Sequence, residues 1–271
     1  MLPRVIMNNK KTTMRLVIRI SNNSLSFATA AADGTVSFEP YPVRGGMSMA
    51  ANLRQAFGES HLMADTYHSA HVLLDSPVLL IPAEEFVADS APQLYAYAYA
   101  TGRAEAVECC PVDGLNAVAA FAVNRDLRLV LDDNFRDVSI APVMQTVWHH
   151  ILGHSITGRR KMYVYVHDKR MDVFAIRHGR FAFANAYDAS RQADAVYYLL
   201  SAWKQMGYKP ADDELVVLPG GADVDGFAAA VGGYITNVVR LGPDAVNATM
   251  PDGGAAQMPF DMQLYFAAQR P

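Results

Sequence analysis

A pattern of apolar and polar residues occurs twice in this chain of 271 residues, with the two copies 146 residues apart. Residues 16–27 form an apolar run, a polar turn and an alternating run, and residues 162–173 repeat that order. Each copy then reaches a glycine, Gly34 or Gly179, followed by a third alternating run. Runs and turns of this kind are typical of strands joined by hairpins. The repeat therefore predicts two similar units, each beginning with three strands.

Each copy continues with an amphipathic helix and a further strand. In the first copy Ser48 is suited to cap a helix, and Gly58 is expected to end it in a left-handed conformation. The helix of the second copy ends at Gly207. Both helices lead into apolar runs, 71–74 and 215–218, which are typical of strands buried on both faces of a sheet. The predicted fold class is α/β, with mixed sheets flanked by helices.

The length of the chain suits two domains of roughly 130 residues each. A polar, glycine-containing segment at 155–161 separates the two copies. We therefore predict a first domain over residues 14–155 and a second over residues 156–271. The first has additional elements, including a helix from about Pro142 to Gly153.

Composition and charge exclude several classes of protein. The net charge of -4 does not favour nucleic-acid binding, and we expect no nucleic-acid partner. The sequence contains no apolar stretch of the roughly 20 residues that span a bilayer, and its first residues lack a signal-peptide pattern. The two cysteines, Cys109 and Cys110, are adjacent, which leaves neither a disulfide framework nor a cysteine-rich zinc site. We expect a cytoplasmic protein with no direct membrane insertion.

Two such units in tandem resemble the actin, sugar kinase and heat-shock chaperone superfamily, in which duplicated ribonuclease-H-like domains hold a nucleotide in the cleft between them. More narrowly, the chain resembles an uncharacterised bacterial family with this actin-like ATPase fold, related at fold level to pilus-assembly and secretion platform proteins. The resemblance covers most of residues 14–271 and depends on the order of elements. Gly220 and Gly221, which follow an apolar run and precede a helix-like segment, are similar to the adenosine motif of the superfamily. Paired glycines that merely end a strand remain the alternative.

The resemblance also implies two phosphate loops, each with an Asp for magnesium and a Gly that exposes backbone amides. When the two copies are aligned, Arg19 and Tyr165 occupy the Asp positions, and Ser21 and His167 occupy the Gly positions. Magnesium would lose its carboxylates, and side chains would stand where bare backbone is needed. The resulting prediction is a non-catalytic binding or scaffold protein with a degenerate nucleotide site. We assign it no cofactor, and we expect another protein as its partner.

The alternative is a nucleotide-binding ATPase or sugar-kinase-like phosphotransferase that uses ATP with magnesium at an unconventional phosphate site. A direct pairing of Arg19 with a phosphate implies metal-free nucleotide binding without the usual hydrolysis. Asp168 holds a metal only if the strand register slips, and that slip also needs a bulge. The candidate residues lie in the cleft between the domains: Ser21, Asn22, Asn23, Asp168, Gly220 and Gly221.

Two further patterns have less specific interpretations. His150 and His154 share one face of a predicted helix, which gives a metal-dependent hydrolase as a third hypothesis. The glutamate that a zincin needs after its first histidine is absent, so histidines at a helix end are the alternative, and we assign no metal ligands. Tyr95, Tyr97 and Tyr99 alternate with alanines, which predicts three rings on one face of a strand, suited to packing or to a partner.

Overall fold

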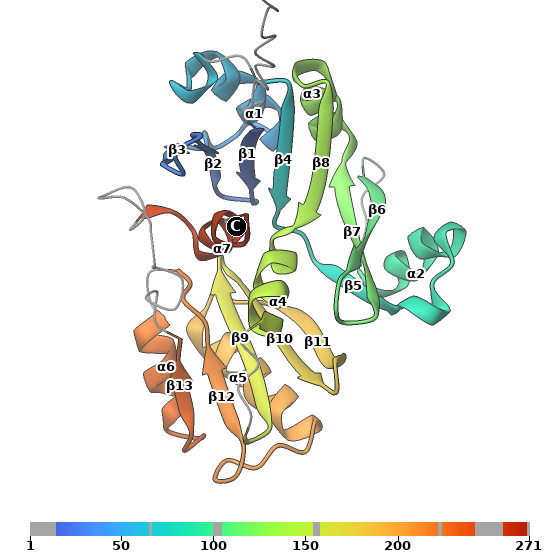
Figure 1. The fold of residues 1–271 in the computed structure, drawn as a ribbon. Helices are drawn as coiled ribbons and strands as arrows, with labels where there is room; N and C mark the ends of the chain where they lie inside the picture. Colours follow the sequence, from blue (N-terminus) through green and yellow to red (C-terminus); the bar gives the residue numbers. More distant parts are fainter. Residues whose placement is uncertain are drawn as a thin grey trace, which may run out of the picture.

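The computed structural model describes residues 15–64, 67–99, 105–153, 158–221, 224–241 and 257–269. Two five-stranded sheets lie one above the other, with two helices crossing between them (Figure 1). A three-stranded sheet projects from the side of the first sheet. The predicted domain boundary between residues 155 and 156 lies outside the described residues.

The first sheet has the strand order β3-β2-β1-β4-β8. The three hairpin strands β1, β2 and β3 are antiparallel, whereas β4 and β8 run parallel to β1. The central strands are buried on both faces, as their continuous apolar runs predict. The bounds are β1 Arg15–Ile20, β2 Leu25–Ala30, β3 Val36–Tyr41, β4 Ser69–Leu74 and β8 Asp137–Pro142.

The second sheet repeats the same topology in the order β11-β10-β9-β12-β13. Arg19 pairs with Ser26 across β1 and β2, and Tyr165 pairs with Asp172 across β9 and β10. These residues differ by the same 146 positions, so the sequence alignment of the two copies is confirmed. The bounds are β9 Lys161–His167, β10 Arg170–Arg177, β11 Arg180–Asp188, β12 Glu214–Val217 and β13 Val238–Arg240.

Helices cover both faces of each sheet. Helices α1 and α3 pack together against the first sheet, and α5 and α6 against the second. Ser48 caps α1 as predicted, because its hydroxyl oxygen accepts from the amide of Ala51. Gly58 does not end that helix, so this prediction was wrong: α1 continues until Ser60, whose hydroxyl donates to Glu39. The bounds are α1 Met49–Glu59, α3 Arg125–Asn134, α5 Gln192–Gln205 and α6 Val224–Gly232.

Helices α4 (Val143–Gly153) and α7 (Phe260–Ala268) cross between the sheets, and each packs on the sheet of the other copy. Helix α4 follows the last strand of the first sheet, yet Trp148 lies edge-on against Phe181 of β11. Helix α7 follows the second sheet, yet Ser26 of β2 contacts its Met262. The two halves of the chain are thus joined by exchanged helices as well as by their linker.

The material between β4 and β8 forms the side sheet, in the order β5-β7-β6, together with α2. Tyr95 and Tyr97 lie on α2 and Tyr99 caps its end, so the predicted strand was wrong. Pro92 in the first turn favours a helix start, and on a helix Tyr97 is separated from Tyr95 and Tyr99, whose ring centroids lie 5.1 Å apart. Tyr95 is buried and Tyr97 is 79% exposed. The bounds are β5 Val78–Pro82, β6 Glu105–Val112, β7 Ala117–Asn124 and α2 Ala91–Ala98, with short 3-10 turns at Leu62–Ala64, Ala83–Glu85 and Ala88–Ser90.

None of the helices in the described part of the chain is long and apolar enough to cross a membrane.

Candidate functional site

The turns that follow β1 and β9 meet between the two sheets. In the first turn the hydroxyl of Ser21 lies 2.8 Å from that of Ser24. The Ser24 hydroxyl also donates to Asp168 in the second turn, over 3.0 Å. Asn22 and Asn23, at the tip of the first turn, are exposed. The structure thus brings the predicted residues Ser21 and Asp168 to one place, where the two turns are in direct contact.

Arg19 is buried at the centre of this contact, with a side chain only 2% exposed. Its Nε and Nη2 donate to the two carboxylate oxygens of Asp261 on α7, at 2.7 and 2.8 Å. Its Nη1 lies 2.7 Å from an oxygen of Asp168. Tyr165, at the equivalent position of the second copy, donates its hydroxyl to Asp261 over 2.9 Å. Two residues at equivalent positions of the two copies therefore bind the same carboxylate of this chain.

A second group of charges surrounds His167, which is buried at the end of β9. Its Nε2 lies 2.8 Å from Asp172 on β10, and its Nδ1 lies between Asp75 and Asp168, 3.8 and 3.7 Å from their oxygens. Arg170 pairs with Asp75 and Asp172 at 2.8 and 3.0 Å. Because Asp75 follows β4 of the first sheet, these contacts also connect the two halves.

The pKa values in this cluster follow from burial and from the mixture of charges. Burial lowers the pKa of His167, but the neighbouring carboxylate of Asp168 and the bond with Asp172 outweigh it and raise the value to about 9. Burial likewise opposes the charged form of Asp168, yet His167 and Arg19 hold its pKa well below its usual range. Burial raises the pKa of Asp75. His167 is thus an imidazolium at neutral pH.

Asp75, His167 and Asp168 are the one group of three candidate metal ligands that lie close enough together within the described part of the chain. The residues around them do not fit a magnesium–nucleotide complex. Guanidinium nitrogens of Arg19 and Arg170 already lie 2.7 and 2.8 Å from carboxylate oxygens of Asp168 and Asp75. Two fixed positive groups at that distance repel a cation, and they neutralise the carboxylates in its place.

Gly220 and Gly221 follow β12 and lie against the end of β9. A Cβ on Gly220 would stand 2.0 Å from the carbonyl oxygen of Val166, whereas one on Gly221 would stand 3.9 Å from it. The amide of Gly221 donates to that same carbonyl over 2.9 Å. The close approach of the backbone at Gly220 to that of Val166 explains why a glycine is needed there, and no bound ligand is required for that explanation.

Three carboxylates of the cluster, those of Asp75, Asp172 and Asp261, were missed by the sequence analysis. Asp75 could have been predicted from the sequence, because it is a carboxylate directly after a buried parallel strand. Ligand-binding sites of α/β sheets lie at the carboxyl ends of such strands. Asp172 aligns with Ser26 of the first copy and interrupts an apolar run. Asp261 had no signal in the sequence, because only the packing of α7 on the other half brings it to Arg19.

The metal-dependent hydrolase hypothesis depended on His150 and His154. His150 lies beside Phe260 of α7, and His154 lies outside the described residues.

Comparisons with known proteins place the chain in a family. A model described as "Protein of unknown function (DUF3822)" matches residues 6–238. The chain belongs to the DUF3822 family. Comparison with curated proteins gave no significant match.

Comparison with solved structures identifies the fold of this DUF3822 protein. A Bacteroides thetaiotaomicron protein "with actin-like ATPase fold and unknown function" superposes with a TM-score of 0.80 at 22% identity, over 97% of this chain and 99% of that one. A chain of the "PilM-PilN type IV pilus biogenesis complex" superposes with a TM-score of 0.64 at 12% identity, over 95% and 99%. The chain has the actin-like ATPase fold, as the sequence predicted, and no catalytic role follows from that fold.

The buried pairing of Arg19 predicts a large loss of stability on substitution. Arg19→Met leaves Asp261 buried with only Tyr165, so we expect the free energy of unfolding to fall by about 3–5 kcal/mol in chemical denaturation. Arg128→Met, which breaks partly exposed pairs with Asp132 and Glu108, is the control and should cost less than about 1 kcal/mol. Equal losses in the two variants would contradict a structural role for Arg19.

The raised pKa of His167 predicts a stability that falls with rising pH. The contribution is complete below pH 6.5, the value of an unperturbed histidine, and is lost as pH passes about 9. Over that window the free energy of unfolding should fall by up to about 3 kcal/mol more in the wild type than in His167→Gln. Denaturation series at several pH values measure the difference, and parallel curves for the two proteins would refute it.

The two glycines should respond differently to alanine. Gly220→Ala forces backbone apart and should destabilise the protein by about 2–4 kcal/mol. Gly221→Ala should change stability by less than about 1 kcal/mol, because its Cβ makes only ordinary contact. Thermal and chemical unfolding of both variants test this, and a tolerated Gly220→Ala would show that the close approach to β9 is not required.

Proposed function

We propose that this DUF3822 protein is a non-catalytic binding or scaffold protein, in which its own side chains close the position of the superfamily's nucleotide site. The observation that carries the proposal is the buried Arg19, bound by Asp261 of α7 and Asp168 of the opposite turn. The two turns that would enclose a phosphate touch each other instead, through Ser24 and Asp168.

The charges at this position argue against a polyphosphate. Four carboxylates, those of Asp75, Asp168, Asp172 and Asp261, surround two guanidinium groups and one imidazolium. Both guanidinium groups already have carboxylate partners, so a phosphate would have to displace a buried anion of the protein. Displacement would leave that carboxylate unpaired, at a cost of several kcal/mol.

The nucleotide-dependent enzyme remains the second hypothesis, with Ser21, Asn22, Asn23, Asp168, Gly220 and Gly221 as its site. It would require the two turns to separate and Arg19 to leave Asp261. The exposure of Asn22 and Asn23 is the feature that favours it.

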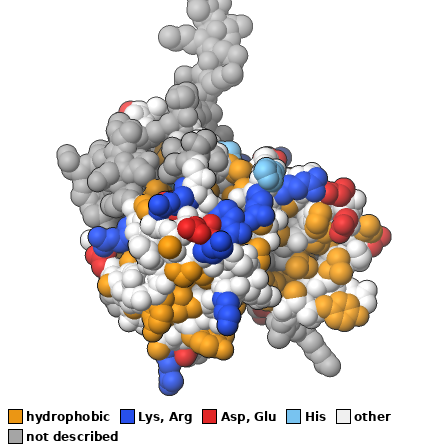
Figure 2. All heavy atoms as spheres, turned by 90° about the horizontal axis from the view of Figure 1, so that it is seen from below, with side chains coloured by type: hydrophobic (Ala, Val, Ile, Leu, Met, Phe, Trp, Pro, Cys, Tyr) orange, Lys and Arg blue, Asp and Glu red, His pale blue; other side chains and the backbone are white. Residues whose placement is uncertain are grey.

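The proposed partner is another protein. Val87, Leu94 and Tyr97 are exposed on α2 and on the segment before it, and Figure 2 shows hydrophobic side chains gathered at that side of the molecule. Clustered exposed apolar groups are typical of interaction surfaces. The similar chain belongs to a structure described as a PilM-PilN complex, which agrees with a protein-binding role for the fold. We also propose a cytoplasmic setting, where thiols such as the free Cys109 and Cys110 stay reduced.

Calorimetric titration with ATP tests the proposal directly. With magnesium, and again with excess chelator, we expect neither heat of binding nor thermal stabilisation up to millimolar ATP. A ligand at a hundred times its dissociation constant would add about 2.7 kcal/mol, which is easily measured. Titration with adenosine separates binding of the base near Gly220 from binding of the phosphates. Magnesium-dependent binding of ATP would overturn the proposal in favour of the enzyme.

A further inference from the structure

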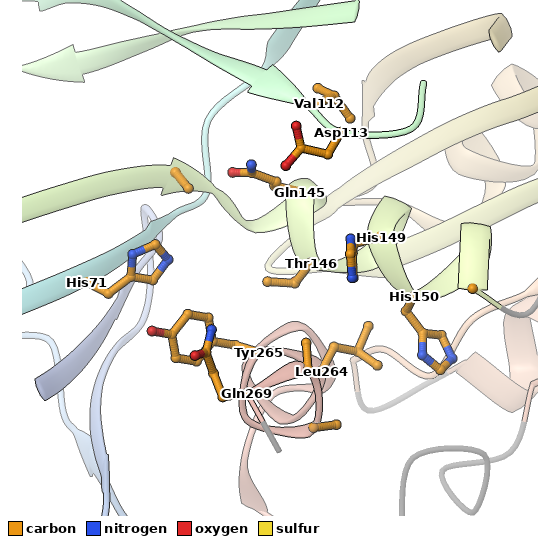
Figure 3. A pocket seen from close by; sticks show the side chains of 14 residues that line it. His71, Val112, Asp113, Gln145, Thr146, His149, His150, Leu264, Tyr265 and Gln269 are labelled. Atoms are coloured by element: carbon orange, nitrogen blue, oxygen red, sulfur yellow. The ribbon is translucent and has the colours of Figure 1, made fainter. Parts of the chain in front are cut away.

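A cavity of about 560 Å³ lies beside the crossing of α4 and α7, away from the charged cluster. It is bounded by these two helices, by strands β4 and β8, and by the tip of the hairpin that joins β6 and β7. Figure 3 shows Asp113 and Gln145 on one side, Tyr265 and Leu264 on the other, and His71 at one end. Its volume lies within the range of pockets that bind small organic molecules.

Among the described residues that line the cavity, the acidic and basic side chains are one carboxylate and three histidines, His71, His149 and His150. Asp113 is the single carboxylate among the described residues that line the cavity, and neither lysine nor arginine occurs among them. Asp113 also has no ion-pair partner within the described part of the chain. Helix α4 reaches the cavity with its last residue, Gly153, and α7 with its last turn, Ala267 to Gln269. Carbonyl groups at the end of a helix carry partial negative charge, which adds to that of Asp113.

The wall opposite Asp113 is aromatic and apolar. The rings of His71 and Tyr265 are stacked, with centroids 4.7 Å apart, and Leu264 continues the same wall. His71 Nδ1 lies 2.7 Å from the hydroxyl of Ser139, which fixes the ring. Burial lowers the pKa of His71 to about 4, so this ring is neutral at physiological pH. A flat apolar body suits this wall, and a positive charge suits the other side.

We propose that this cavity binds an organic cation in which a protonated amine is attached to a flat aromatic body. The amine pairs with Asp113, and the body lies along Tyr265, Leu264 and His71. The site is separate from the Arg19 cluster. Its existence does not depend on whether nucleotide binds there, so either proposal can fail without the other.

A series of three indole compounds tests the sign of the charge at constant body shape. Tryptamine carries an ammonium group, tryptophol a hydroxyl and indole-3-acetate a carboxylate. Ligand-observed NMR and calorimetry on the full chain should show tryptamine binding at least about fivefold more tightly than tryptophol, with indole-3-acetate weakest. Lack of tryptamine binding would overturn the proposal, and so would equal binding of all three.

Two variants locate the site. Asp113→Asn should weaken tryptamine about fivefold and leave tryptophol unchanged, whereas Asp89→Asn, an exposed carboxylate on another segment, should change neither. Thr146→Phe should fill the cavity and abolish binding of both. Asp113 is exposed, so its variant should keep the wild-type unfolding midpoint and stays informative if Thr146→Phe does not fold. Unchanged tryptamine affinity in Asp113→Asn would refute the assignment.

Discussion

The buried ion pair between Arg19 and Asp261 is the contact on which the arrangement of the two halves depends. It connects the first strand of the first sheet to a helix that follows the second sheet, across 242 positions of sequence. Two parallel hydrogen bonds fix the orientation of the guanidinium group, and Tyr165 and Asp168 bind the same pair from the second half. Paired charges that are fully desolvated contribute little net stability, but leaving either one alone is costly. The pair therefore favours one closed arrangement.

The ion pair lies where the two halves exchange helices, because Asp261 belongs to the exchanged helix α7. Helix α4 comes from the first half and packs under the second sheet, while α7 comes from the second half and packs on the first. Each half thus completes its core with a helix of the other. A hinge between two self-contained domains would leave such faces exposed, which is unfavourable for apolar surface. The crossing also creates the cavity beside Asp113, since two crossed helices diverge from their point of contact.

The two turns show how a duplicated fold can keep its architecture while its polar residues differ between the copies. In both copies the strand before the turn keeps its register, which apolar packing on two faces enforces. The residues at the turn are not fixed by that packing. Arg19 and Tyr165 occupy equivalent positions, differ in charge and shape, and are both satisfied by Asp261. Fold and catalytic chemistry are in this sense separable.

The sequence by itself determined the repeat, the hairpin strands, the α/β class and the equivalence of Arg19 and Tyr165 in the two copies. These features depend on local periodicity, which a single chain displays directly. Local signals failed at Gly58 and at the tyrosines of α2, where Ser60 and Pro92 set the helix ends. Only the tertiary structure decided where Asp75, Asp172 and Asp261 lie, and that the two turns touch. Their contacts join residues that are up to 242 positions apart, and no pattern within one segment encodes which distant charge will neutralise it.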